Sequence, residues 1–139
     1  MAETIPQSLR RSVTSRAKGR CEYCQSPESF ATERFSIEHI QPRRTGGLTV
    51  VENLALACQG CNGYKAAKTA AIDPESETVV PLFHPRRQVW AEHFAWSEDY
   101  LQIVGTTPTG RATIGLLQLN RSSLVNLRRA LLAVQKHPI

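Results

Sequence analysis

The sequence has few aromatic residues, only one methionine and no long apolar run. Aromatic residues make up 6% of its 139 positions, so the 41% of residues that are hydrophobic should form a modest, mainly aliphatic core. No segment approaches the roughly 20 apolar residues that span a membrane, and residues 1–16 lack the apolar run of a signal peptide. We therefore expect a cytoplasmic protein that does not associate with membranes.

The charge balance is basic, with 17 Lys and Arg residues against 12 Asp and Glu residues, a net charge of +5 and a pI of about 9.3. This excess favours a polyanionic partner such as nucleic acid. Basic residues begin near the N-terminus, where Pro6, Ser8 and the run from Arg10 to Lys18 predict a short helix that ends at Gly19. Its basic face is either a solvated surface or a phosphate contact.

The chain has four cysteines, arranged in two Cys-x-x-Cys pairs. In a cytoplasmic protein thiols stay reduced, so four of them are more typical of a metal site than of disulfides. Four thiolates suit a tetrahedral zinc ion, and a site closed by four cysteines leaves no position open for catalysis. Cys21 with Cys24, and Cys58 with Cys61, therefore predict a structural zinc. Buried free cysteines or two disulfides are the alternatives.

Between the cysteine pairs, the pattern predicts a strand, a loop, a second strand and a helix. Residues 34–40 alternate as a strand, and the basic loop at residues 43–47 contains two glycines that free the backbone for a turn. Residues 48–51 would return as the second strand. Residues 62–69 then predict a short helix.

The remainder of the chain predicts a connector followed by mixed strands and helices. Residues 72–85 contain three prolines and should form a connector without regular structure. Residues 89–96 could be a helix or a strand, and residues 100–104 alternate as a strand. Apolar positions at helical spacing predict helices over residues 111–119 and 122–135. Together these elements indicate an α+β fold.

Four polar residues near the cysteines carry the groups that phosphodiester hydrolysis needs. His39 is a suitable general base because an imidazole titrates near neutral pH. The side-chain oxygens of Glu38 and Asn62 could hold one hard cation such as Mg²⁺. Asn53 is better placed to orient the loop through backbone hydrogen bonds. Neighbours on a strand point to opposite faces, so Glu38 and His39 would share a phosphate only at a bent strand end or an edge.

These motifs resemble the HNH endonucleases of the ββα-metal class, in the branch that carries four zinc-binding cysteines. The resemblance covers Cys21 to Lys68, about a third of the chain. It rests on the segments CEYC, IEHIQP, GG, ENL and CQGCN and on the lysines after them. It implies an HNH core within residues 1–70. Residues 71–139 would be a connector and a strand and helix extension packed on the core, of the kind found on many bacterial HNH proteins.

The resemblance also implies a role for each polar residue of the motif. His39 would be the general base, Glu38 and Asn62 would bind the catalytic divalent cation, and Asn53 would support the loop that positions His39. Two positions depart from the usual pattern. Asn62 stands where the family's name expects histidine, and Glu38 stands where aspartate or histidine is frequent.

The leading hypothesis is a metal-dependent endonuclease that hydrolyses DNA by nicking or double-strand cleavage. It would use structural Zn²⁺ and catalytic Mg²⁺ or another divalent cation, and it would contact nucleic acid through Arg43, Arg44, Lys65 and Lys68. One alternative is a non-catalytic, zinc-stabilised nucleic-acid-binding module, which needs the cysteines but not the polar residues of the motif. Another is a zinc-stabilised protein-interaction domain. The sequence defines neither the target nor the oligomeric state.

Overall fold

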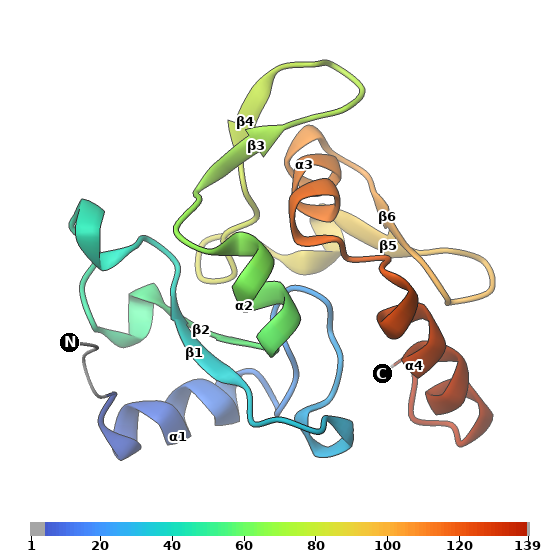
Figure 1. Ribbon diagram of the computed structural model, residues 1–139, viewed down its shortest axis with the longest axis horizontal. Helices are drawn as coiled ribbons and strands as arrows, with labels where there is room; N and C mark the ends of the chain where they lie inside the picture. The colour runs from blue at the N-terminus through green and yellow to red at the C-terminus, as the bar shows by residue number, and fades with distance from the viewer. Residues whose placement is uncertain (1–4, 139) are drawn as a thin grey trace. The chain divides into compact units, whose positions relative to one another are not determined.

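A computed structural model describes residues 5–138. The chain divides into two compact units. The first runs to Thr69 and also includes His84–Arg87, and the second comprises Ala70–Phe83 and the chain from Gln88 onward. Each unit combines helices with two-stranded antiparallel sheets, which confirms the predicted α+β class (Figure 1). Over the part of the chain that the structure describes, no helix has the length and apolar character to cross a bilayer.

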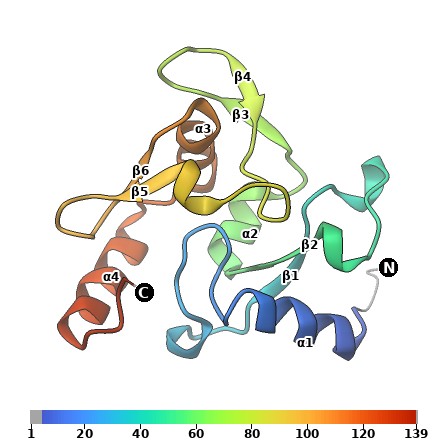
Figure 2. The ribbon, with the colours of Figure 1, turned by 180° about the vertical axis from the view of Figure 1, so that it is seen from behind.

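The first unit is built around one pair of short strands. Strands β1 and β2 are antiparallel, and all four residues of β2 are buried. Helix α1 contacts β2 and helix α2 contacts β1, so the strand pair lies between the two helices (Figures 1 and 2). The regular elements of this unit are α1 (Gln7–Arg16), η1 (Glu28–Phe30), β1 (Ser36–His39), η2 (Arg43–Thr45), η3 (Val51–Asn53), β2 (Leu54–Ala57) and α2 (Gln59–Lys65).

Helix α1 is fixed at its C-terminal end by backbone hydrogen bonds and by Arg16. Gly19 adopts a left-handed φ of 69° just beyond the helix, and its N–H donates to the carbonyl of Thr14. The Arg16 guanidinium donates to the carbonyls of Val51, at 2.8 Å, and Leu54, at 2.5 Å. Part of the basic face predicted for this helix therefore binds backbone of its own unit rather than solvent.

The second strand of the first unit lies later in the chain than the sequence predicted. The expected strand at residues 48–51 is not formed, and β2 begins at Leu54 after the short 3₁₀ turn η3. Because the segment Leu54–Ala57 is buried on both faces, it reads as a continuous apolar run without the alternation that marks a half-buried strand. The error in the prediction came from requiring that alternation.

Helix α2 begins three residues before its predicted start. Cys58 caps the helix, since its sulfur accepts a hydrogen bond from the N–H of Cys61 at 3.4 Å. The helix ends at Lys65 because Ala66 takes a φ of 49°, which breaks the helical backbone. The cysteine pair is therefore part of the helix start and not of a separate turn.

The described part of the second unit contains two hairpins, two α-helices and one short 3₁₀ helix. The predicted connector at residues 72–85 is wrong in part, because β3 and β4 form a hairpin around a turn held by Asp73. Thr107 caps α3 by accepting a hydrogen bond from the N–H of Gly110 at 3.0 Å, and Trp90 packs on Phe94 with ring centroids 5.1 Å apart. The elements are β3 (Ala70–Ile72), β4 (Val79–Pro81), η4 (Trp90–Glu92), β5 (Phe94–Trp96), β6 (Ile103–Gly105), α3 (Pro108–Leu117) and α4 (Ser122–Ala133).

Candidate active site and metal centre

The four cysteines converge on one point in the first unit. All four are buried, none forms a disulfide, and their sulfur atoms all lie within 4.8 Å of one another. The Sγ atoms of Cys24 and Cys58 are 3.7 Å apart. In a tetrahedral zinc site with Zn–S bonds of about 2.3 Å, sulfurs lie about 3.8 Å apart. Cys21, Cys24, Cys58 and Cys61 are therefore positioned to bind a metal ion, and four sulfur ligands suit zinc.

Each cysteine pair is shaped by the same backbone hydrogen bond. The N–H of Cys24 donates to the sulfur of Cys21, and the N–H of Cys61 donates to the sulfur of Cys58, both at 3.4 Å. Hydrogen bonds within the cluster, from Cys21 first, lower the pKa of Cys58, whereas burial raises the pKa of Cys21. The thiolate is the metal-binding form of cysteine, so a cation bound at this cluster would stabilise the deprotonated sulfurs.

The first cysteine turn also carries a tyrosine that reaches β1. Tyr23 is fully buried, and its hydroxyl donates a hydrogen bond to Oε1 of Glu38 at 2.5 Å. Burial raises the pKa of Tyr23, so the hydroxyl keeps the proton that it donates. A residue between two candidate zinc ligands is thereby joined to a carboxylate that the sequence assigned to the catalytic cation.

Glu38 is a buried carboxylate held by a buried lysine. Its other oxygen, Oε2, lies 2.5 Å from Nζ of Lys65 and accepts no aligned hydrogen bond from the residues described. Glu38 is 4% exposed and Lys65 is 1% exposed. Burial raises the pKa of Glu38, while the charge of Lys65 and the hydrogen bonds act in the opposite direction. Lys65 and Tyr23 therefore do not fully compensate the cost of burying the negative charge of Glu38.

His39 occupies the last position of β1, where the strand gives way to the loop at residues 41–53. Its ring is half-buried, and Nε2 lies 2.8 Å from the hydroxyl oxygen of Thr49 in that loop. When Nε2 carries the ring proton, it donates a hydrogen bond to the Thr49 oxygen, and in that tautomer the ring lone pair is on Nδ1. The loop therefore influences which nitrogen of His39 can take up a proton.

Asn53 holds the ends of that loop together through backbone groups. Its Oδ1 accepts from the N–H of Gln41 at 2.8 Å, and its Nδ2 donates to the carbonyls of Gln41 at 3.0 Å and Leu48 at 2.9 Å. Gly47 fits closely inside the same loop, where an added Cβ would collide with the backbone of Gln41. The loop that contains Thr49 is thus closed by an amide and requires a glycine.

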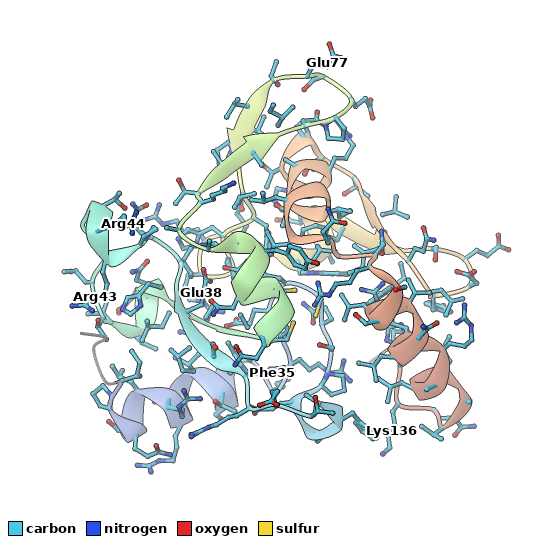
Figure 3. The ribbon with its side chains drawn as sticks, in the orientation of Figure 1. Phe35, Glu38, Arg43, Arg44, Glu77 and Lys136 are labelled. Atoms are coloured by element: carbon cyan, nitrogen blue, oxygen red, sulfur yellow. The ribbon has the colours of Figure 1, made fainter. Side chains whose placement is uncertain are left out.

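Five of the sequence-predicted residues border one open pocket of about 350 Å³. Glu38 and His39 come from β1 and Asn62 comes from α2, while Arg43 and Arg44 belong to η2. Figure 3 labels Glu38, Arg43 and Arg44. Neighbouring residues in the middle of a strand point to opposite faces. Glu38 and His39 nevertheless border the same pocket, because His39 is the last residue of the strand. Two arginines at its wall make it a suitable place for an anionic group.

Three predicted site residues lie elsewhere. Asn53 does not border the pocket and acts on the loop. Lys68 is exposed outside it. The expectation that Lys65 contacts nucleic acid is wrong for this structure, because a side chain with 1% exposure and an ion pair to Glu38 presents no ammonium to a phosphate.

Two residues of the site were not predicted. Tyr23 lies between two cysteines, and only its place in the motif CEYC offered a signal. Thr49 lies in a loop predicted as a strand, and a single threonine there carries no pattern of its own. Both contacts depend on residues at least ten positions away in the sequence, which spacing alone does not bring together.

With this geometry in view, the comparisons with known proteins place the segment. The family model described as HNH endonuclease matches residues 21–68, which include both cysteine pairs and His39. The resemblance found in the sequence is therefore confirmed over this segment: residues 21–68 match the model of a family of nuclease-type or nucleic-acid-binding modules, and the match includes the four cysteines positioned for a metal ion. The comparisons with curated proteins and with solved structures gave no match.

Proposed function

We propose that this protein is a metal-dependent HNH endonuclease that hydrolyses phosphodiester bonds of DNA, by nicking or by double-strand cleavage. The observation that carries the proposal is the pocket in which His39, Glu38 and Asn62 meet, inside the segment that matches the HNH family. A module that only binds nucleic acid has no need of a half-buried imidazole, a buried carboxylate and an amide around one space.

His39 is the general base in this proposal. A neutral imidazole can take a proton from a water molecule that attacks the phosphorus. Thr49, whose hydroxyl oxygen lies 2.8 Å from Nε2, would orient the imidazole ring for this role. Asn53 would act through the loop as a positioning residue, since the hydrogen bonds of its side-chain amide fix the backbone at Gln41 and at Leu48, the residue before Thr49.

The catalytic cation would be held by Glu38 and Asn62. The donor set fits a hard cation, because Oε2 of Glu38 lacks an aligned donor and the Asn62 side chain makes no hydrogen bond to other residues of the described chain. When bound, Mg²⁺ or a similar ion supplies positive charge to the phosphate and the leaving oxygen. The four cysteines would hold a separate structural Zn²⁺.

The DNA backbone would be contacted by the arginines around the pocket. Arg43 and Arg44 border it, and Lys68 is exposed nearby in the sequence. A second open groove, of about 460 Å³, runs along α1 and includes Arg10, Arg11 and Arg34 with one acid, Glu28. Burial and then the neighbouring charge of Arg34 lower the pKa of Arg10, while Glu28 acts in the opposite direction. Both surfaces suit phosphates.

Nicking of supercoiled plasmid by the purified protein tests the proposal, with Mg²⁺, Mn²⁺ or EDTA present. We expect cleavage that needs the divalent ion and that His39→Ala abolishes at unchanged zinc content. His84→Gln is the matched control, because it removes an imidazole from the same unit but not from the pocket. Equal cleavage by wild type and His39→Ala would overturn the role of His39.

A non-catalytic, zinc-stabilised nucleic-acid-binding module remains the second candidate. The observation that favours it is the ion pair between Glu38 and Lys65, which gives the carboxylate a cation from the protein itself. If wild type and His39→Ala both shift DNA in a gel and neither cleaves it with any divalent ion, this second candidate is the better account.

A further inference from the structure

Lys65 is a buried cation at the end of α2, beside the proposed catalytic pocket. Its side chain is 1% exposed. Nζ lies 2.5 Å from Oε2 of Glu38 and donates a hydrogen bond to the carbonyl of Ile40 at 3.1 Å. Burial of an ammonium group is costly unless it is paired and hydrogen-bonded, and Lys65 has both kinds of partner.

These two partners have different consequences for the carboxylate. The bond to Ile40 fixes the ammonium to the backbone immediately after β1, whether or not Glu38 stays in place. The ion pair with Glu38 engages the one carboxylate oxygen that Tyr23 does not bind. A positive charge thus stands next to the oxygen with which a divalent cation would have to interact.

We propose that Lys65 is an internal counter-ion of the Glu38 site, a positioning residue that holds the carboxylate in place and weakens its affinity for the divalent cation. This inference rests on the proposed function, because it assumes that Glu38 is a ligand of that cation. Tyr23 completes the arrangement by holding Oε1 from the first cysteine turn. The lysine after the second cysteine pair therefore acts through Glu38 and not on DNA.

The physical basis is the repulsion between two cations that share one carboxylate. An ammonium that is anchored to Ile40 cannot move far when a second cation arrives. The Coulomb energy between two charges a few ångströms apart is larger in a poorly hydrated site than in water. Removing the charge of Lys65 while keeping a hydrogen-bond donor should therefore raise the affinity for the metal.

Lys65→Gln provides that change, since its amide can donate to Ile40 and to Glu38 without carrying charge. Mn²⁺ binding to the zinc-loaded protein is measured by isothermal titration and by the loss of the free Mn²⁺ signal in electron paramagnetic resonance. We expect Lys65→Gln to bind Mn²⁺ about tenfold more tightly than wild type. Lys65→Arg, which keeps the charge, should stay near wild type. Lys68→Gln, an exposed control three residues on, should not change the affinity.

Unchanged or weaker Mn²⁺ binding in folded Lys65→Gln overturns the inference and leaves Lys65 with a packing role. Should the variant lose zinc and unfold, side-chain NMR of the unmodified protein decides the question. Addition of Mg²⁺ should then shift the Nζ resonance of Lys65 and not that of Lys68, and an unmoved Lys65 resonance overturns the inference.

Failure of the inference can be told apart from failure of the proposed function. Metal-dependent nicking by wild type, together with unchanged Mn²⁺ affinity in Lys65→Gln, removes only the role of Lys65. Absence of both nicking and Mn²⁺ binding in the zinc-loaded wild type removes the catalytic cation, and the role of Lys65 with it.

Discussion

Asp73 in the second unit and Glu38 in the first unit both form ion pairs, but they differ in how many donors bind the carboxylate. Asp73 in the second unit is bound by Arg111 through Nε at 2.9 Å and Nη2 at 3.0 Å, and it also accepts from the Ser76 hydroxyl and from two backbone N–H groups. Glu38 in the first unit has one lysine and one tyrosine. The Arg111 guanidinium and the other donors hold the pKa of Asp73 well below its usual range, whereas burial raises the pKa of Glu38.

The difference separates a structural acid from a functional candidate. Asp73 has donors for both oxygens and closes the turn between β3 and β4, so nothing remains for it to bind. Glu38 borders a pocket, and one of its oxygens lacks an aligned donor. A buried acid that is incompletely compensated beside a pocket is a recognised mark of a site that acts on a ligand. The degree to which a buried carboxylate is compensated therefore explains the structural role of Asp73 in the hairpin and marks Glu38 in β1 as a candidate functional residue.

The largest expected effect is the unfolding of the first unit when the metal ion at its four cysteines is removed. Structural zinc contributes an apparent 10–16 kcal/mol or so to the folding of small zinc domains at neutral pH. The second unit contains no cysteine, and both tryptophans, Trp90 and Trp96, lie in it. We expect a strong chelator, or Cys58→Ser, to abolish amide-exchange protection in β1 and β2 while tryptophan fluorescence changes little.

Simultaneous loss of both signals would show that the second unit depends on the first. The control is Ser26→Ala, which removes a hydroxyl 3.0 Å from the sulfur of Cys24 but no ligand. This variant should retain its zinc and its amide protection.

A smaller effect is expected when the two acids are neutralised separately. Glu38→Gln leaves Lys65 buried without a counter-ion, and breaking a buried pair in this way costs about 3–5 kcal/mol. Asp73→Asn leaves Arg111 with 24% side-chain exposure, so water can compensate its charge. We therefore expect the free energy of unfolding, measured by urea titration with amide exchange, to fall more in Glu38→Gln.

The double variant Glu38→Gln with Lys65→Met checks the cause of that loss. Since it removes both charges, it should recover much of the stability while it remains inactive in the nicking assay. A double variant as unstable as Glu38→Gln would mean that the loss comes from packing and not from the unpaired ammonium.

Much of the fold and of the site could be predicted from the sequence because local patterns determine them. The cysteine pairs, a strand within residues 34–40, a short helix in the region after Cys58 and the α+β class follow from spacing and alternation, although the helix begins three residues before its predicted start. Strand β2 was missed because a strand buried on both faces shows no alternation. The hairpin at β3 and β4 was missed because its turn is held by the side chain of Asp73, which composition does not reveal.

The partners of the site residues were beyond the reach of the sequence. The role of Lys65 depends on a contact with Glu38 across 27 positions, and that contact exists only once α2 packs on β1. A lysine in the last turn of a short helix is expected to be a surface cation until its burial is known. Long-range pairing of buried charges is set by tertiary packing, so the candidate site residues could be named from the sequence and their electrostatic balance could not.

The smallest expected effect is a change in how the second unit responds to acid. The pKa of Asp73 is lower in the folded protein than in the unfolded chain, so its contribution to stability is present above the unfolded pKa, near 3.8, and is lost as the pH falls toward the folded value. Asp73→Asn lacks this titration. Its deficit relative to wild type in thermal unfolding, followed by tryptophan fluorescence, should be largest above pH 5 or so and should shrink as the pH approaches 2 or so.

Glu98→Gln, an exposed acid of the same unit, should leave a curve parallel to wild type. A constant deficit in Asp73→Asn would instead assign the effect of Asp73 to the shape of the turn, and the contrast with Glu38 would then rest on hydrogen bonding and not on charge.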